Sequence, residues 1–524
     1  MHFFNTAGPV NKNDHYCIDP LSRFDLSNIY MLVEQKKYMM LHAPRQTGKT
    51  SYLIAFSEFI NNEGKYNCLY LNVEAVFTGA NDILESMKGI LFELASRARD
   101  YLHDTFPESI AVKVLEEKGP NLAFNELLTL WSKNSPKPII LLIDEIDALE
   151  GDVLGSILRQ IRAGFDKRPQ LFPQSIIFCG VEDIRYKRIA DPNGNSVTGV
   201  QGFNVEAKSL KLSNFSREEI KSLFDQYTSE KNLDVEPEVF EAIWHLTRGQ
   251  PWLVNALAYE ICFEMVPRKQ DIKVISLREV QEASENLIQR REIHLTNLLE
   301  RLKEEKVKKI ISPILTGEKI MNDPSEEDVR YLLDLGIINI DRNTIHIAND
   351  IYKEIIPRSL IYPTQLLIQY NLASYLDDND ELNLRKMLKA FQSFFNKYYE
   401  RWVSYFYYKD AGPFLLLQAF LQRIIDGGGQ IVRQYFLGRG RVTLLIKWPT
   451  KSSEQNVLID MRYLTGNLKE AIKEGAEILG IEMMNLGIKY GHLVYFEKNY
   501  TSLSEQKVFS QNLSKGYTID VWKI

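Results

Sequence analysis

Short, continuous apolar runs alternate with longer segments of helical periodicity over residues 1–210 of this 524-residue chain. The runs have the length and the all-round hydrophobicity of buried strands, and they cover residues 38–41, 69–73, 138–143 and 175–180. Between them, apolar residues recur at helical spacing over residues 83–101, 123–131 and 153–162. Strands that alternate with helices predict a parallel sheet covered on both faces, so the predicted fold class is α/β.

After residue 210 the pattern becomes helical. Ser216 and Glu219 have the spacing of a capping box, which predicts the start of a helix. A second helix is predicted over residues 239–247, and a third over residues 252–263 after a turn that contains Gly249 and Pro251. Short helices and then a strand pair around Asp341, Arg342 and Asn343 predict a winged helix between residues 268 and 362.

The last part of the chain predicts a separate small α/β unit. Residues 361–364 and the acidic segment 377–381 mark its beginning, and the boundary is placed near residue 365. Helices are predicted through residues 391–395 and over 414–425 and 469–479; strands are predicted over 430–435, 441–446, 456–462 and 492–496.

Composition and charge restrict the class of protein only broadly. A content of 45% apolar and 25% charged residues is that of an ordinary globular protein, and the length implies several domains. The net charge of −6 provides no global attraction to nucleic acid. The four cysteines show no metal-binding spacing, and neither a signal peptide nor a membrane span is evident, so we expect reduced thiols and a cytoplasmic location.

The strand predicted at 38–41 leads into a phosphate-loop pattern that opens the next helix. Ala43 stands in the first position, where Gly is usual, and Gly48, Lys49 and Thr50 stand at the turn into the helix. Backbone N–H groups at such a turn bind phosphate, Lys49 supplies positive charge, and Thr50 can ligate Mg²⁺. The predicted nucleotide-binding residues are Ala43, Pro44, Arg45, Gln46, Thr47, Gly48, Lys49, Thr50 and Ser51.

A pair of acids follows the strand predicted at 138–143. Ligands bind at the carboxyl ends of the strands in α/β sheets, so Asp144 is predicted to hold the Mg²⁺ shell together with Thr50. Glu145 is predicted to orient or deprotonate an attacking water. The candidate catalytic residues are therefore Lys49, Asp144 and Glu145.

The segment before the first predicted core strand offers two interpretations. His15 and Tyr16 lie in an extended stretch that could cover a nucleotide base, and their rings would then stack on it. Packing against the sheet is the alternative.

The strings FNTAGP at residues 4–9, LHAPRQTGKT at 41–50 and GQPWLVNA at 249–256 resemble the bacterial AAA+-like ATPases of the STAND type. The resemblance covers most of the first 360 residues. It implies that Pro251 and its neighbours in the helical lid contact the adenine ring and couple nucleotide state to domain position. Similar proteins carry an arginine where this chain has Glu182, so the γ-phosphate sensor is either lost or replaced by Arg185.

The C-terminal layout resembles the PD-(D/E)xK nuclease fold that ends many proteins of this ATPase family, and the string GRGRV at 438–442 is its most specific part. In that fold an Asp and a Glu-x-Lys pair hold Mg²⁺ and a water. The matching positions here are Thr443, Asp460 and Arg462. Gln434 occupies the position of a further, upstream acid. We therefore expect a retained fold with a lost active site; the alternative is that another acid, such as Glu454, serves.

These observations together predict a nucleotide-binding domain over 1–210, a helical lid over 211–267, a winged-helix-like domain over 268–362 and an inactive nuclease-like domain over 363–524. The predicted function is ATP binding with slow hydrolysis, in which ATP or ADP with Mg²⁺ switches the C-terminal module. An ATP-gated DNA-processing nuclease and a nucleotide-bound scaffold without turnover are the alternatives. The sequence leaves open a protein or nucleic-acid partner of the C-terminal domain and a homo-oligomer.

Overall fold

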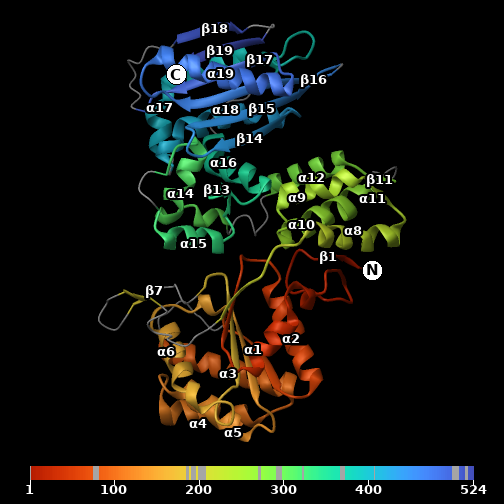
Figure 1. Cartoon of the computed structure of the whole chain (residues 1–524), viewed down its shortest axis with the longest axis vertical. Helices are drawn as coiled ribbons and strands as arrows, with labels where there is room; N and C mark the ends of the chain where they lie inside the picture. The colour runs from red at the N-terminus through yellow and green to blue at the C-terminus, as the bar shows by residue number, and fades with distance from the viewer. Residues whose placement is uncertain are drawn as a thin grey trace. The chain divides into compact units, whose positions relative to one another are not determined.

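The computed structural model describes residues 2–74, 82–183, 188–190, 196–198, 208–268, 273–290, 298–320, 324–365, 372–405, 408–451, 453–498, 507–513 and 517–524. Two compact units make up the chain (Figure 1). The first contains Met1–Gln289 and Arg330–Gly336, and the second contains Arg290–Val329 and Ile337–Ile524.

A five-stranded sheet forms the centre of the first unit. Its order is β4-β5-β6-β3-β9, and every neighbouring pair is parallel. The strands are β3 (Met39–His42), β4 (Asn67–Asn72), β5 (Ile139–Asp144), β6 (Ser175–Gly180) and β9 (Lys208–Lys211). The parallel sheet is confirmed, and β9 is an edge strand that the apolar pattern did not predict, because two of its four residues are lysines.

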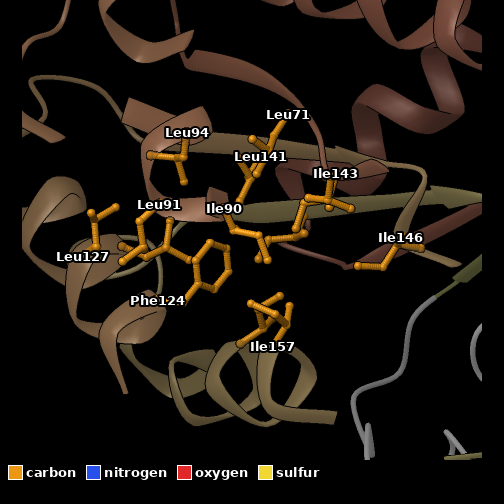
Figure 2. Close-up of a cluster of buried hydrophobic side chains, with 14 of the residues drawn as sticks. Leu71, Ile90, Leu91, Leu94, Phe124, Leu127, Leu141, Ile143, Ile146 and Ile157 are labelled. Atoms are coloured by element: carbon orange, nitrogen blue, oxygen red, sulfur yellow. The ribbon is translucent and has the colours of Figure 1, made fainter. Parts of the chain in front are cut away.

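Helices cover both faces of this sheet. One face carries α3 (Ile83–Leu102), α4 (Phe106–Lys118), α5 (Ala123–Asn134) and α6 (Gly151–Ala163), and the other carries α1 (Leu26–Glu34) and α2 (Lys49–Glu63). Figure 2 shows Leu71, Leu141 and Ile143 of the sheet against Phe124 of α5 in the first of these cores. Because side chains alternate along a strand, the next residues, such as Leu142, enter the core against α2. Helix α4 was not predicted.

The region predicted as a helical lid follows the sheet in the chain. It contains α8 (Arg217–Lys231), β10 (Asp234–Val235), α9 (Pro237–Thr247), α10 (Pro251–Tyr259), a π-helical turn at Glu260–Met265 and α11 (Val266–Arg268). Strand β11 (Val274–Ile275) and α12 (Leu277–Arg290) come after it. Ser216 and Glu219 form the predicted capping box, each side chain accepting the other's backbone N–H.

The N-terminal segment packs on the lid helices. Strand β1 (Phe3–Phe4) pairs in parallel with β2 (His15–Tyr16), and a 3₁₀ turn follows at Pro20–Arg23. The buried Phe4 ring lies 5.8 Å from the Phe224 ring and 5.9 Å from the Tyr227 ring, measured between centroids. The segment is thereby fixed beside the helices that follow the sheet.

Residues 298–365 contain the helices α14 (Glu305–Thr316), α15 (Glu326–Asp334) and α16 (Asp350–Gln365), and the antiparallel hairpin β12 (Ile338–Asp341) with β13 (Thr344–Ile347). The strand pair predicted around residues 341–343 is confirmed. Arg342 and Asn343 have φ values of 46° and 61°, the left-handed conformation that a two-residue hairpin turn requires.

A six-stranded mixed sheet ends the chain, with the order β14-β15-β16-β17-β19-β18 (blue in Figure 1). The strands are β14 (Gln430–Phe436), β15 (Arg441–Pro449), β16 (Glu454–Tyr463), β17 (Tyr490–Phe496), β18 (Lys507–Leu513) and β19 (Tyr517–Lys523). The helices are α17 (Leu384–Tyr405), α18 (Gly412–Asp426) and α19 (Leu468–Leu486). All predicted elements of this region are present, and β18 and β19 are additions.

All four cysteines are unpaired thiols, three of them buried. Within the described ranges, no helix combines the length and the apolar character needed to cross a membrane.

Candidate functional site

The phosphate loop lies between β3 and α2, as predicted. Gly48 has a φ of +94° and forms the N-cap of α2 without any side-chain hydrogen bond to the cap, so backbone N–H groups remain available to an anion. The Lys49 ammonium group donates to the carbonyl oxygens of Ala43 and Pro44, at 2.9 and 3.0 Å. These contacts hold the charge within the curve of the loop.

The structure brings Thr50 and Asp144 together across the end of the sheet. The Thr50 hydroxyl donates to Asp144 Oδ2 at 2.6 Å, and the Tyr70 hydroxyl donates to the same oxygen at 3.0 Å. The Glu145 N–H donates to Asp144 Oδ1 at 3.0 Å. Asp144 is fully buried. The Thr50 hydroxyl and the Asp144 carboxylate therefore lie together at the N-terminus of α2, and these are oxygen ligands of the kind that Mg²⁺ binds. Among the described residues, no group of three or more His, Cys, Asp and Glu side chains is placed to hold a metal ion by itself.

Glu145 occupies an unusual position beside this pair. Its φ is +57°, a conformation that non-glycine residues rarely adopt and that occurs at functional sites. Burial raises the pKa of Glu145 to about 7; the Lys49 charge opposes the shift, and Asp144, Asp147 and Glu74 add to it. A carboxyl group with a pKa near 7 can exchange a proton with water at neutral pH.

A pocket next to the phosphate loop is formed by three parts of the first unit. The N-terminal segment supplies Asn5, Thr6, Gly8, Tyr16 and Arg23; the loop and α2 supply Gln46, Thr47, Gly48 and Ser51; the lid supplies Phe215, Pro251, Trp252 and Asn255. Pro251, predicted from the resemblance, therefore lines the pocket beside the phosphate loop.

Hydrogen bonds connect the walls of this pocket. Gln250 of the lid donates to the Arg45 carbonyl at 3.4 Å, and the Trp252 indole donates to the Thr6 carbonyl at 2.9 Å. Arg23 donates to the Thr47 carbonyl at 3.3 Å and to the Ser213 carbonyl. The resemblance covered Gln250 and Trp252 as neighbours of Pro251. The sequence reasoning did not single out Arg23, because only the folded chain brings it to the loop.

His15 and Tyr16 take different positions. Tyr16 lines the pocket, but its ring packs 5.1 Å from the Phe4 ring and its hydroxyl donates to Glu230 of α8 at 2.6 Å. His15 is outside the lining and accepts the Asn11 N–H at 2.9 Å. Tyr16 therefore contacts Phe4 of the N-terminal segment together with Tyr227 and Glu230 of α8, whereas the sequence reasoning weighed only the base and the sheet.

The residues after β6 include the position where the resemblance implies an arginine. Glu182 stands there, two residues beyond Gly180. Asp147 accepts the Val181 N–H at 2.9 Å and so ties the end of β6 to the turn after β5. Arg185 lies outside the described residues.

The nuclease-like positions align across three strands of the second unit. Gln434 of β14 is paired with Thr443 of β15, and Thr443 is paired with Asp460 of β16. Arg462 donates to Asp460 with both its Nη2, at 2.8 Å, and its Nε, at 3.2 Å. Arg441 Nη1 is 3.4 Å from Asp460 Oδ2, and Nη2 of the same side chain pairs with Glu482.

Glu454, the alternative acid, lies at the opposite end of β16. Glu454 is exposed and is paired with Pro449 of β15. It lies six residues before Asp460 along β16. At a rise of about 3.4 Å per residue, that separation is about 20 Å, too far for one metal to bridge. Glu454 and Asp460 therefore do not form one site.

The parallel sheet, the phosphate loop and the acid at the end of β5 define the first unit as a P-loop nucleotide-binding α/β fold. No protein-family model and no curated protein sequence matches the chain.

Similar solved structures include the Walker-type ATPase PABY2304 of Pyrococcus abyssi, with a TM-score of 0.46, 16% identity, and coverage of 67% of this chain and 99% of that one. The Thermotoga maritima RuvB Holliday junction branch migration motor has a TM-score of 0.33 and 16% identity over 63% of this chain and 93% of its own. Cdc6p of Pyrobaculum aerophilum has a TM-score of 0.35 and 16% identity over 65% and 93%. Because these similarities are low, the fold class of the first unit is assigned from its own parallel sheet and phosphate loop.

Proposed function

We propose that the chain binds ATP or ADP with Mg²⁺ and acts as an AAA+-like switch of the STAND type that turns ATP over slowly. The observation that carries the proposal is the pocket beside the phosphate loop, whose walls come from the N-terminal segment, the loop and the lid. A nucleotide there would touch all three parts at once. Its phosphates would act on the loop while its base contacts the lid, so the lid would respond to nucleotide state.

The residues present fit such a ligand. Lys49 is held inside the loop by carbonyl oxygens that a phosphate group can replace as its partner. Thr50 and Asp144 are already in contact and would hold the Mg²⁺ shell, which supplies positive charge beside the phosphates. Ala43 is buried and its φ is not positive, so the first position of the loop accommodates a Cβ atom in this geometry.

Hydrolysis would depend on Glu145. Its carboxyl group lies next to Asp144, and its raised pKa suits a group that accepts a proton from water near neutral pH. A nucleotide-bound scaffold without turnover is the second candidate. It is favoured by Glu182, because a carboxylate near the γ-phosphate would repel it where an arginine would stabilise it.

The proposed target of the switch is the C-terminal domain, a PD-(D/E)xK nuclease-like fold without cleavage activity. The support is the double pairing of Asp460 with Arg441 and Arg462. Two guanidinium groups neutralise the one carboxylate, and arginine cannot release a proton to activate water. The rival, an ATP-gated nuclease, would show Mg²⁺- or Mn²⁺-dependent nicking of plasmid by the full-length protein; we expect none, with or without ATP.

The remaining domain assignments belong to the same proposal. Helices α14 and α15 with the β12–β13 hairpin are assigned to a winged-helix-like domain over residues 268–362, and residues 363–524 to the nuclease-like domain. A protein or nucleic-acid partner of that domain, self-association of the chain and a cytoplasmic location are further parts of the proposal.

Titration with a fluorescent ATP analogue tests nucleotide binding. Lys49→Ala removes the charge at the phosphates, and a charge-assisted contact of about 1.5–3 kcal/mol predicts an affinity about 10–150-fold weaker. Lys65→Ala is the matched control, since Lys65 forms an exposed ion pair with Glu34 beyond the far end of α2. Equal affinity of the wild type and Lys49→Ala would contradict the site.

A further inference from the structure

We propose that Tyr70 is a positioning residue for Asp144 and thereby sets the affinity of the nucleotide site for Mg²⁺. The inference rests on the proposed function, because it concerns the metal that accompanies the nucleotide. Neither the phosphate-loop pattern nor the acid pair after β5 includes this tyrosine.

Tyr70 and Asp144 share one face of the sheet. Tyr70 on β4 is paired with Leu142 on β5, and Asn72 is paired with Asp144, so side chains at these alternate positions point to the same side. The phenol thus reaches forward along the strand, and its hydroxyl lies 3.0 Å from Asp144 Oδ2.

The hydroxyl is one of several donors around a buried carboxylate. Asp144 Oδ2 accepts from Thr50 and from Tyr70, Oδ1 accepts the Glu145 N–H, and the Cys179 thiol also lies beside the carboxylate. An oxygen of this kind takes about two hydrogen bonds, so the two hydroxyls saturate Oδ2. Tyr70 therefore determines which side of the carboxylate remains open to the Mg²⁺ shell.

The tyrosine ring is itself held in place from the other side. The Arg97 guanidinium lies 5.0 Å from the centre of the Tyr70 ring, and the Asn72 amide is 3.5 Å from the Tyr70 hydroxyl. Arg97 and Tyr70 also line a surface cavity with Tyr101, Ser57 and Asn61. The position of the Asp144 carboxylate is thus connected to an accessible surface of the domain.

Tyr70→Phe is the informative change, because it removes one oxygen and leaves the ring beneath Arg97. Fluorescent ATP is titrated into the full-length protein in excess EDTA, and Mg²⁺ is then titrated at fixed nucleotide. We expect unchanged metal-free affinity and a Mg²⁺ midpoint about 3–10-fold higher, since a buried carboxylate loses one of its donors. Tyr101→Phe is the control: Tyr101 also lies beside Arg97, but it is 71% exposed and far less buried than Tyr70.

Three results would overturn the assignment of Tyr70. They are a Mg²⁺ midpoint that stays the same or falls, an equal rise in Tyr101→Phe, and a metal-free affinity that falls by the same factor as the Mg²⁺ affinity. The last would show that the hydroxyl acts on the fold rather than on the metal position. A wild-type protein that binds nucleotide without any response to Mg²⁺, or does not bind it, would instead overturn the proposed function itself.

Discussion

Two buried aspartates, one in each unit of the chain, are held in opposite ways. Asp144 accepts hydrogen bonds from the neutral hydroxyls of Thr50 and Tyr70, so its negative charge is left for a cation. Asp460 is paired with the guanidinium groups of Arg441 and Arg462, so its charge is already neutralised by the chain.

The difference concerns the donors rather than the acid. Both carboxylates are fully buried, and burial of an unpaired charge is costly in either place. Neutral donors orient a carboxylate without cancelling its charge, whereas a two-pronged arginine occupies both oxygens. The first arrangement suits Mg²⁺ binding, and the second replaces a metal by fixed internal cations.

The largest effect is expected when Glu145, the residue beside Asp144, is changed. Glu145→Gln should keep nucleotide binding and lower kcat by about 10²–10⁴-fold, because a general base acts only on the attacking water. Phosphate release in single-turnover and steady-state assays measures the effect. An unchanged kcat would remove Glu145 from the catalytic role; a wild type without any phosphate release would favour the scaffold.

Removing the second aspartate should lower stability instead of activity. Asp460→Ala leaves Arg441 and Arg462 buried without their shared partner, which costs about 3–5 kcal/mol. In calorimetry, the midpoint temperature of unfolding of the second unit should fall by about 6–20 °C. This transition is recognised because added nucleotide does not change its midpoint. Glu454→Ala, an exposed acid on the same strand, is the control and should change little. Equal behaviour of the two variants would show that the arginines do not depend on Asp460.

A smaller effect is expected from the contact between Gln250 of the predicted lid and the phosphate loop. Gln250→Ala removes the hydrogen bond to the Arg45 carbonyl and also the N-cap bond from the Leu253 N–H at the start of α10. We expect ADP binding to weaken about 2–10-fold, the equivalent of about 0.5–1.5 kcal/mol. Gln289→Ala is the matched control, because Gln289 is exposed and its amide donates to Glu285 of the same helix, α12. The same loss of affinity in both variants would exclude a specific contact between lid and loop.

The sequence was sufficient for those parts of the molecule that depend on local patterns. The loop from Ala43 to Ser51 and the acid Asp144 stand at the ends of continuous apolar strands, and parallel strands bring such ends to one edge of the sheet. In the second unit, the period of two along a strand predicted that Asp460 and Arg462 lie on one face, and the two side chains are in contact. The match of Thr443 to a nuclease position came from the resemblance.

The parts that the sequence did not predict depend on contacts between distant segments. Tyr70 looked like one more strand residue, and only the register of β4 against β5 brings its hydroxyl to Asp144. Arg23 lies 24 residues before Thr47 in the sequence. Its guanidinium group reaches the Thr47 carbonyl only because of the way the N-terminal segment folds. Arg441, which belongs to the GRGRV string, is buried against Asp460 and Glu482, and only the packing of the sheet shows these partners.

Binding of Mn²⁺ to the full-length protein, followed by electron paramagnetic resonance, tests the contrast between the two aspartates most directly. Mn²⁺ takes the oxygen ligands that Mg²⁺ prefers, and its signal falls when it binds. We predict one tight Mn²⁺ site per chain that appears only with ATP or ADP and is lost in Asp144→Asn. A tight site that forms without nucleotide and disappears in Asp460→Asn would show that the C-terminal carboxylate is open to metal, and would contradict the account.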